Sequence, residues 1–336
     1  MKTLICTTPG QFTYADTPVP ERKQGETLLR IRRVGICGTD LHAYEGTQPY
    51  FQYPRILGHE LAAEIIATDE PGFTAGEQVT IIPYFYCGNC VACKAGKNNC
   101  CTQLKVCGVH VDGGMREYLV VPSYSLVKSR GLGLEELALV EPLAIGAHGI
   151  RRAQVTSGEW VAVIGAGPIG LGVMEFARIA GAHVIAVDVQ ECRLQFCKER
   201  LQIPFTINAA KENVPAQLAQ LTNGDMPTVV IDATGNLSAI NESFRYLAHG
   251  GRYVLVGLQK GEIRFSHPEF HQREATLMSS RNATREDFDR VIEALLNGQV
   301  LPLTYITHQV LFGEVKEAFP AWLFPENQVI KAMVTI

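Results

Sequence analysis

The sequence has no apolar run that approaches the roughly 18 residues needed to cross a membrane. Its first segment, MKTLICTTPG, carries one lysine and reaches Pro9 and Gly10 before an apolar stretch of secretory length can form. Internal repeats and low-complexity linkers are also absent from the 336 residues. We therefore expect a cytoplasmic protein, in which thiols stay reduced.

The chain also lacks an excess of charge of either sign. Its 30 Lys and Arg residues face 34 Asp and Glu residues, which gives a net charge of -4. This balance provides no electrostatic attraction to nucleic acids or to anionic membranes, so we expect neither as a partner. The hydrophobic content of 46% is ordinary for a soluble globular protein, and the length allows two domains, each with its own core.

The pattern of apolar residues changes along the chain. Up to about residue 140 it indicates short strands broken by Gly and Pro, such as TLLRIRRVGIC, LAAEIIATD and EQVTIIPYF. From about Glu159 strands alternate with helices, among them a helix over 169–180 that Gly181 terminates. Further strands are predicted in TVVIDATG and RYVLVG, with the helix-like SAINESFRYLAHG between them. This alternation predicts a parallel, doubly wound sheet. The later segment TREDFDRVIEALLNGQVLPLTYITHQVLF predicts a capped helix and a strand, which can close either domain.

A glycine-rich turn, GAGPIG, follows the apolar stretch 161–164 and opens the predicted helix. In such a turn the first glycine permits the tight bend, the second lets a pyrophosphate approach the backbone, and the third lets helix and strand pack closely. The helix N-terminus offers unpaired N–H groups and a partial positive charge to the phosphates. We therefore predict a dinucleotide site that includes Gly165, Gly167, Pro168, Ile169 and Gly170.

An acidic residue stands where a dinucleotide site needs one, because Asp188 ends the next predicted strand. Its carboxylate can accept hydrogen bonds from the ribose hydroxyls of adenosine and repels a 2′-phosphate, which predicts NAD rather than NADP. Arg193, further along, can stack on the adenine; placed closer to the strand it would have favoured NADP.

Five cysteines lie together in YFYCGNCVACKAGKNNCC. Cys87, Cys90 and Cys93 recur every third residue, and Cys100 and Cys101 follow as a pair. A ferredoxin-type cluster prefers a shorter last spacing followed by proline, and disulfides need an oxidising compartment. Four thiolates can close a tetrahedral zinc site, so we predict a structural zinc with either Cys100 or Cys101 as the last ligand.

A second set of metal ligands lies in GICGTDLH, which contains Cys37, and in GHE, which contains His59, with EPLA beginning at Glu141. Alone, such a cysteine is more often a small buried hydrophobe, such a histidine a packed core group and such a glutamate a solvated one. Together with a nicotinamide site, a thiolate, an imidazole and a carboxylate are typical of an open catalytic zinc site.

This donor set suits the oxidation of an alcohol, in which the hydroxyl proton must leave before or with the hydride. A zinc ion makes a bound hydroxyl acidic, just as it lowers the pKa of bound water from about 15.7 to about 7. Thr39 and His42 can carry the proton to solvent, and Asp40 can orient a metal-bound histidine.

These motifs resemble those of the zinc-dependent medium-chain dehydrogenases over essentially the whole chain. VGICGTDLH, LGHE, GKNNCC, DGGMREY, EPLA and VIGAGPIG occur in the family's usual order. The resemblance implies an α/β protein with a GroES-like, mainly β catalytic domain from residues 1–146 and 285–336. It also implies a Rossmann NAD-binding domain from residues 147–284 and a homodimeric or homotetrameric assembly.

The resemblance also implies two zinc ions per chain. The catalytic one would be held by Cys37, His59 and Glu60, with Glu141 either a direct ligand or the partner of a zinc-bound water. For the structural one, the family pattern GxxNxC selects Cys101 over Cys100.

The resemblance further implies that Thr39 and His42 occupy the family's proton-relay positions. One departure narrows the substrate, because alcohol dehydrogenases proper have a cysteine where this chain has Glu141. The carboxylate version resembles the polyol, threonine and sugar-acid branch. Within that branch LKVCGVHVDGG, SHPEFHQRE and SSRNAT most resemble the L-galactonate and L-idonate 5-dehydrogenases.

We therefore expect NAD-linked oxidation of a secondary hydroxyl on a sugar acid or polyol. By family position, Arg281 is a candidate to bind a substrate hydroxyl or carboxylate, with a cofactor or surface contact as the alternative. A sorbitol-like or L-threonine dehydrogenase would use the same machinery. A catalytically silent or quinone-reductase-like relative would be expected to lack Cys37, His59 and Glu60.

Overall fold

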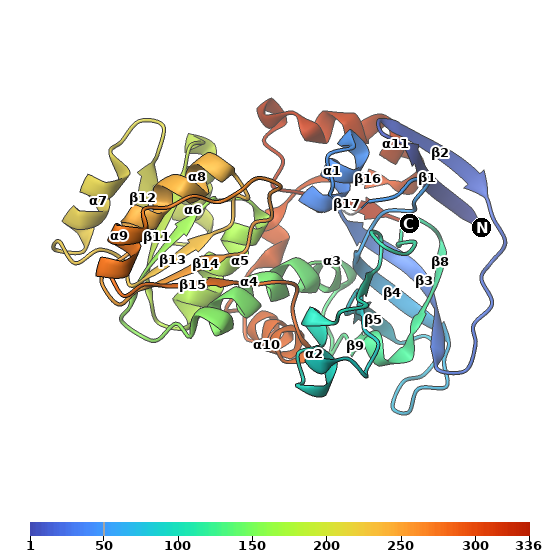
Figure 1. Ribbon diagram of the computed structural model, residues 1–336. Coiled ribbons are helices and arrows are strands. Elements are labelled where there is room, and N and C mark those ends of the chain that lie inside the picture. Colours follow the sequence, from blue (N-terminus) through green and yellow to red (C-terminus); the bar gives the residue numbers. More distant parts are fainter. Residues whose placement is uncertain (50) are drawn as a thin grey trace. The chain divides into compact units, whose positions relative to one another are not determined.

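The computed structural model describes residues 1–49 and 51–336, and the chain divides into two compact units (Figure 1). The first consists of Met1–Pro142 and Thr284–Ile336, and the second of Leu143–Ala283. The late helix and strand, for which the sequence left two possibilities, belong to the first unit. Among the described residues, no helix combines the length and apolar character that a bilayer span requires.

The first unit is built mainly from β-structure. Its main sheet has seven strands in the order β16-β17-β3-β4-β5-β9, with β8 paired to β3. Neighbouring strands are antiparallel except β16 and β17, which are parallel. The strands are β3 (Glu26–Gly35), β4 (Glu60–Ala67), β5 (Gln78–Ile81), β8 (Tyr118–Pro122), β9 (Leu126–Lys128), β16 (Ile306–Leu311) and β17 (Lys331–Thr335).

Smaller elements complete this unit. Two further antiparallel pairs are β1 (Lys2–Thr8) with β2 (Gln11–Asp16), and β6 (Tyr84–Phe85) with β7 (Lys105–Val106). The helices are α1 (Gly38–Glu45), α2 (Val91–Lys94), α3 (Leu134–Ala138), α10 (Arg285–Leu296) and α11 (Val315–Ala318), while α4 (Val140–Ala153) contains the unit boundary. Short 3₁₀ turns of this unit lie at Asn98–Cys100, Ser123–Ser125, Pro302–Tyr305, Phe312–Glu314, Phe319–Leu323 and Pro325–Asn327, and one of the second unit lies at Phe244–Tyr246.

Buried apolar side chains that alternate along the strands form the core of the first unit. In β4, Leu61, Ala63 and Ile65 join one buried cluster, and β3 contributes Leu29 and Ile31 to it. Because side chains alternate across a strand, Glu60 at the start of β4 lies on the opposite face of the sheet from Leu61. The register that buries the apolar residues therefore also fixes the direction in which Glu60 points.

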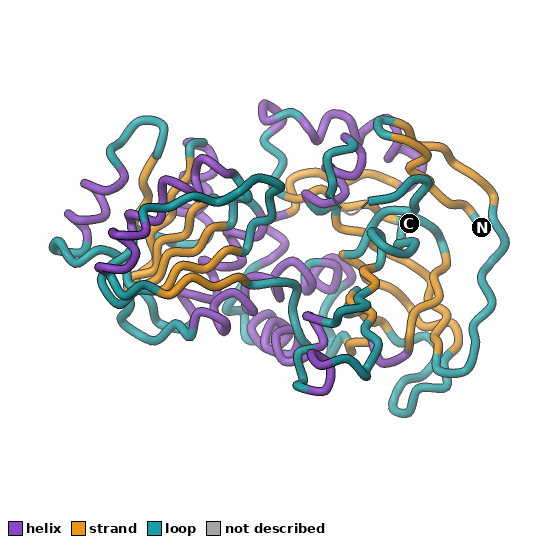
Figure 2. The backbone as a smooth tube through the Cα atoms, viewed as in Figure 1, coloured by secondary structure: helices purple, strands orange, loops and turns teal. Residues whose placement is uncertain are grey.

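The second unit contains a six-stranded parallel sheet in the order β12-β11-β10-β13-β14-β15 (Figure 2). This is the strand order of a Rossmann sheet. The order in which successive strands are added reverses at β10 and β13, and Rossmann sheets bind ligands at that point. The strands are β10 (Trp160–Ile164), β11 (His183–Asp188), β12 (Phe205–Asn208), β13 (Val229–Asp232), β14 (Arg252–Leu255) and β15 (Thr276–Ser279). The helices are α5 (Pro168–Ile179), α6 (Glu191–Arg200), α7 (Val214–Leu221), α8 (Leu237–Ser243) and α9 (His267–Gln272).

Both faces of this sheet are covered, as the sequence predicted for a doubly wound sheet. Ala162 and Ile164 belong to a cluster with residues of α7 and α8, and Val161 and Val163, on the other face, are also fully buried. A parallel strand buried on both faces reads as a continuous apolar run, and β10 has this character. The helix predicted over 169–180 is confirmed as α5, which ends before Gly181 at a φ of 82°.

The glycine turn between β10 and α5 depends on close backbone packing. Gly165 has a φ of 99°, in the left-handed region. A Cβ on Gly170 would lie 1.9 Å from the carbonyl oxygen of Gly165, whereas a Cβ on Gly167 would meet nothing closer than an Arg193 nitrogen at 3.8 Å. The third glycine of the motif therefore serves packing, as predicted, and the second leaves its surroundings open.

This difference predicts opposite effects for two matched substitutions. Gly170→Ala should destabilise the protein by about 1–3 kcal/mol, because the added methyl group overlaps the Gly165 carbonyl. Gly167→Ala should leave the unfolding midpoint in denaturant nearly unchanged while weakening cofactor binding. Equal stability of the two variants would contradict the packing role of Gly170.

Candidate functional site

Four cysteine thiols gather in the first unit. One ligand atom each from Cys87, Cys90, Cys93 and Cys101 lies within 4.8 Å of the others, and all are free thiols. The Sγ atoms of Cys90 and Cys93 are 3.5 Å apart, far beyond the roughly 2.05 Å of a disulfide bond. The exposed Cys100 is outside this group. Of the two candidates for the last ligand, the geometry thus brings in Cys101.

The surrounding backbone favours ionised thiols at part of this group. The backbone N–H of Cys93 is the main cause that lowers the pKa of Cys90 to about 5. Burial, with a contribution from the Cys90 side chain, raises the pKa of Cys93 to about 12. The backbone N–H groups of Cys87 and Gln103 both point at Cys101 Sγ, each at 3.3 Å. A divalent cation would offset the electrostatic repulsion between the four thiolates. The four residues therefore fit a closed zinc site.

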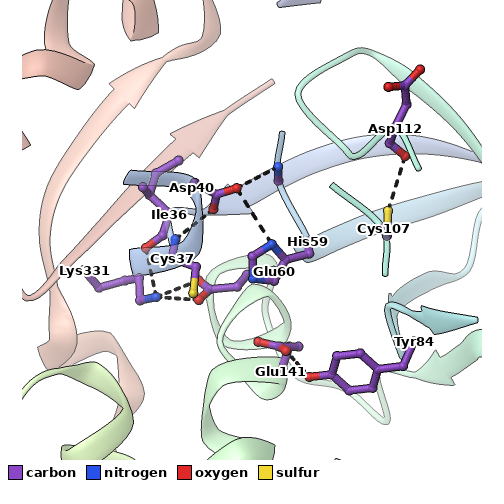
Figure 3. A network of polar contacts seen from close by, with 11 residues as sticks. Ile36, Cys37, Asp40, His59, Glu60, Tyr84, Cys107, Asp112, Glu141 and Lys331 are labelled. Atoms are coloured by element: carbon purple, nitrogen blue, oxygen red, sulfur yellow. Dashed lines mark hydrogen bonds and ion pairs between the residues drawn. The ribbon is translucent and has the colours of Figure 1, made fainter. Parts of the chain in front are cut away.

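A second group consists of Cys37, His59 and Glu60 (Figure 3), whose ligand atoms also lie within 4.8 Å of one another. His59 and Glu60 are buried and Cys37 is half-buried. The pairing of β3 with β4 explains the proximity, because Gly35 stands directly opposite Glu60 and Cys37 follows two residues later. A thiolate, an imidazole and a carboxylate are the donors of an open catalytic zinc site.

The buried carboxylate of Asp40 connects the two segments that carry these ligands. Its Oδ2 accepts a hydrogen bond from the backbone N–H of Cys37 at 2.9 Å, and its Oδ1 accepts one from that of Gly58 at 3.1 Å. Asp40 Oδ1 also faces His59 Nδ1 across 3.8 Å, too far for a hydrogen bond. Asp40, expected to orient the histidine, therefore holds mainly the backbone on both sides of the group.

His59 is electrostatically poised beside this group. Burial by itself would lower its pKa, but the negative charges of Asp40 and Cys37 outweigh burial and raise the pKa well above its ordinary value. Its buried Nδ1 has no hydrogen-bond partner among the described residues. The imidazole therefore lies among negative groups that would also attract a metal cation, and that cation would have to displace its proton.

Sequence reasoning missed Lys331. This side chain is 2% exposed, and its Nζ donates to Glu60 Oε1 at 2.6 Å, to Glu60 Oε2 at 2.7 Å and to the carbonyl oxygen of Ile36 at 3.0 Å. Burial opposes its charge, but Glu60 and Cys37 outweigh burial and raise the pKa of Lys331. The available signal was a lysine directly before the apolar residues of the strand KAMVT.

Glu141 has a different partner. It lies in the first turn of α4, is 4% exposed, and accepts a hydrogen bond from the buried hydroxyl of Tyr84 (Figure 3). Burial, with a contribution from the charge of Glu60, raises the pKa of Glu141. Glu141 is outside the three-residue ligand group, although it interacts electrostatically with His59 and Glu60. Tyr84 was not predicted either.

The two predicted proton-relay residues lie on α1, directly after Cys37. Thr39 is in the first turn and half-buried. The His42 side chain is 59% exposed, with its Nδ1 3.2 Å from Thr47 Oγ1 and 3.5 Å from a carboxylate oxygen of Glu45. An exposed imidazole on the helix that follows Cys37 can exchange protons with water.

The dinucleotide motif of the second unit is arranged around Asp188. Its carboxylate, 8% exposed, accepts hydrogen bonds from the backbone N–H of Ala166 at 2.7 Å and from that of Gln190 at 2.8 Å. Each oxygen keeps a further lone pair for another donor. The guanidinium of Arg193 lies near Gly167. The glycine turn, the acid and the arginine predicted from the sequence thus meet at one end of the sheet.

Arg281, the predicted substrate ligand, follows β15 in the second unit and is exposed. Both metal-ligand groups, by contrast, belong to the first unit.

Comparison with known proteins bears on both units. Residues 23–131 match the alcohol dehydrogenase GroES-like domain, and residues 168–297 match the zinc-binding dehydrogenase family. The chain is similar to L-galactonate-5-dehydrogenase of Escherichia coli K12, with 42% identity over 337 residues that cover 100% of this chain and 99% of that protein. It is also similar to sorbitol dehydrogenase of Halalkalibacterium halodurans, with 30% identity over 344 residues covering 100% and 99%.

Solved structures agree with these matches. The fold superposes on a crystal structure of an alcohol dehydrogenase from Escherichia coli CFT073 in complex with NADH, with a TM-score of 0.93 and 31% identity covering 100% of this chain and 99% of that one. Zinc and NAD are thus the cofactors of this chain, as the sequence predicted. The chain is similar to dehydrogenases over its full length, and each of its two units matches a family model. It therefore belongs to the zinc-type medium-chain alcohol dehydrogenases and is an NAD(P)-dependent alcohol or polyol dehydrogenase with a GroES-like and a Rossmann domain.

Proposed function

We propose that this enzyme oxidises a secondary hydroxyl of a sugar acid, of the L-galactonate type, to a ketone with reduction of NAD. The observation that carries the proposal is the Cys37, His59 and Glu60 group, which unites the donors of an open zinc site. The 42% identity to L-galactonate-5-dehydrogenase, together with the carboxylate at position 141, supports the substrate class.

The catalytic roles follow from the contacts around that group. Cys37 and His59 would hold the catalytic zinc, with Glu60 and Glu141 as the alternatives for a further coordination position. When bound, the zinc ion supplies a positive charge that makes a hydroxyl group acidic. Thr39 and His42 would carry the released proton to water, because the imidazole of His42 is exposed.

The second unit would bind the other cofactor. The turn of Gly165, Gly167, Pro168, Ile169 and Gly170 would receive the pyrophosphate at the start of α5. Asp188 would accept the adenosine ribose hydroxyls and repel a 2′-phosphate, which favours NAD. Arg193 would stack on the adenine, and Arg281 would bind a substrate hydroxyl or carboxylate.

Cys87, Cys90, Cys93 and Cys101 would hold a structural zinc with no open position. The same proposal includes a cytoplasmic location and a homodimer or homotetramer. The exposed edge strand β15, with Leu277 38% exposed, supports pairing with a second copy. Sorbitol-like and L-threonine dehydrogenases remain the rival activities. The presence of Cys37, His59 and Glu60 speaks against a silent or quinone-reductase-like relative.

A substrate panel tests the activity. We expect the formation of reduced nicotinamide to be fastest with L-galactonate or L-idonate, slower with sorbitol and L-threonine, and faster with NAD than with NADP. Initial rates under matched conditions measure this order. Preference for sorbitol or L-threonine would replace the sugar-acid proposal, and cofactor binding without turnover of any substrate would favour the silent relative.

The catalytic zinc is tested by Cys37→Ser. This variant should lose one of about two zinc ions per chain and about 100-fold or more of its activity, while NAD binding stays close to normal. Elemental analysis, initial rates and NAD titration give the three readouts. Cys107→Ser is the matched control, because Cys107 is buried in the same unit but outside both ligand groups. Turnover retained in Cys37→Ser would contradict the assignment.

The structural zinc is tested by Cys90→Ser against Cys100→Ser. Cys90→Ser should lose the other zinc ion and unfold several degrees lower, since about 1 kcal/mol corresponds to roughly 2–4 °C in a domain of 150–250 residues. Cys100→Ser should keep both zinc ions, because Cys100 is exposed and outside the group. The same melting temperature and zinc content in both variants would rule out this site.

A further inference from the structure

Lys331 uses all the hydrogen bonds it can donate, and two of the three go to the predicted metal ligand Glu60. An ammonium group has three N–H donors, and these match Glu60 Oε1, Glu60 Oε2 and the carbonyl oxygen of Ile36. Glu60 is fully buried and Lys331 is 2% exposed. Solvent therefore screens this ion pair very little, and its charges act strongly on their surroundings.

The sheet is shaped to allow this contact. Lys331 begins β17 and Glu60 begins β4, and β3 lies between these two strands. Gly35 of β3 stands opposite both Glu60 and Met333, and a Cβ there would lie 2.2 Å from Glu60 Oε2. The missing side chain at position 35 thus opens the space across which lysine and glutamate meet.

The same carboxylate also faces the metal-ligand group. A Glu60 oxygen lies within 4.8 Å of the ligand atoms of Cys37 and His59, and the lysine nitrogen lies 2.6 Å from the nearer Glu60 oxygen. A metal cation at that group and the ammonium of Lys331 would repel each other across a buried space, and both would attract Glu60.

We propose that Lys331 competes with the catalytic metal ion for Glu60, so that this positioning residue weakens metal binding. Without the metal, Lys331 neutralises a carboxylate whose burial as an unpaired charge would destabilise the fold. With the metal, it shares Glu60 and leaves the coordination position open to exchange. This inference rests on the catalytic zinc site of the proposed function.

Glu141 is a second buried carboxylate, and the group that donates a hydrogen bond to it is different. Its hydrogen-bond partner is the neutral hydroxyl of Tyr84, which carries no charge to oppose a metal. The two glutamates proposed for one coordination position thus differ in the charge of the group that holds them. Glu60 is held by a direct ion pair with an ammonium, whereas the hydroxyl that holds Glu141 is neutral and the positive charges of His59 and Lys331 act on it without a hydrogen bond.

The test is the affinity for zinc of the catalytic site, measured by competition with a chromogenic chelator while the structural zinc stays bound. Lys331→Met should bind this zinc about tenfold more tightly than the unchanged protein, within the usual range for coupling between sites. Lys331→Arg keeps the charge and should stay close to the unchanged protein. A merely structural lysine would, when removed, leave the affinity unchanged or reduce it, and either result overturns the proposal.

A second comparison applies if Lys331→Met does not fold without metal. Glu60→Gln leaves the ammonium facing the metal, whereas Glu60→Gln with Lys331→Met removes both charges. The double variant should bind zinc about tenfold more tightly than Glu60→Gln, and equal affinities would overturn the proposal.

Thermal unfolding gives an independent readout. Lys331→Met should lose more stability after chelator treatment than when zinc-loaded, because the metal then replaces the missing positive charge. Equal losses in the two states would count against competition for Glu60. If the protein without substitutions bound no second zinc ion, the proposed function itself would be refuted. This outcome differs from a failure of the Lys331 proposal, in which the second zinc ion is present but Lys331→Met does not change its binding.

Discussion

Several buried negative groups share a small space in the first unit, and their mutual repulsion is the constraint on which the site depends. Asp40, Glu60 and Glu141 are almost completely buried, and the thiol of Cys37 lies beside them. Each carboxylate needs a partner, since an unpaired buried charge costs several kcal/mol. Asp40 receives backbone N–H groups, Glu60 receives an ammonium and Glu141 receives a phenol. A cation bound by Cys37 and His59 would reduce this repulsion, which explains why the donor set suits a metal.

The two cysteine-containing ligand groups both bring negative groups close together, but different parts of the fold assemble them. The four thiols of the Cys87–Cys101 segment come from one short stretch, and the backbone N–H groups of Cys87 and of nearby Gln103 donate to Cys101 Sγ. Few distant elements are needed to form such a group. The Cys37 group instead depends on the register of β3 against β4 and on the presence of β17 beside them. We infer that the first group is a local structure and the second a product of the folded sheet.

The Rossmann unit separates packing from binding within one motif. Gly170 lets α5 approach the Gly165 carbonyl, whereas Gly167 faces open space near Arg193. Asp188 holds the turn through Ala166 and still presents its carboxylate at the end of the sheet. The same acid therefore stabilises the turn and is available to discriminate between cofactors.

The sequence by itself determined what is local or periodic. It predicted the two-domain α/β architecture, the helix after GAGPIG and the four-cysteine segment, because apolar period, glycine spacing and cysteine spacing are visible in the order of residues. It also named Cys37 and His59 with a carboxylate as metal donors from their residue types, and the family resemblance added Glu60, with Glu141 as either a direct ligand or the partner of a zinc-bound water. The periodic pattern of the late helix α10 fits either domain; the family resemblance implied the first one, and the folded chain has α10 in the first unit.

Only the tertiary structure decided which charges neutralise one another. Lys331 is 271 residues from Glu60 in the chain, and Tyr84 is 57 residues from Glu141. No local pattern links such pairs, because their contact depends on strand order and on the empty position at Gly35. The order of residues specifies which donors are present, and the arrangement of the sheet determines the partner that each donor meets, since charges interact through space and not along the chain.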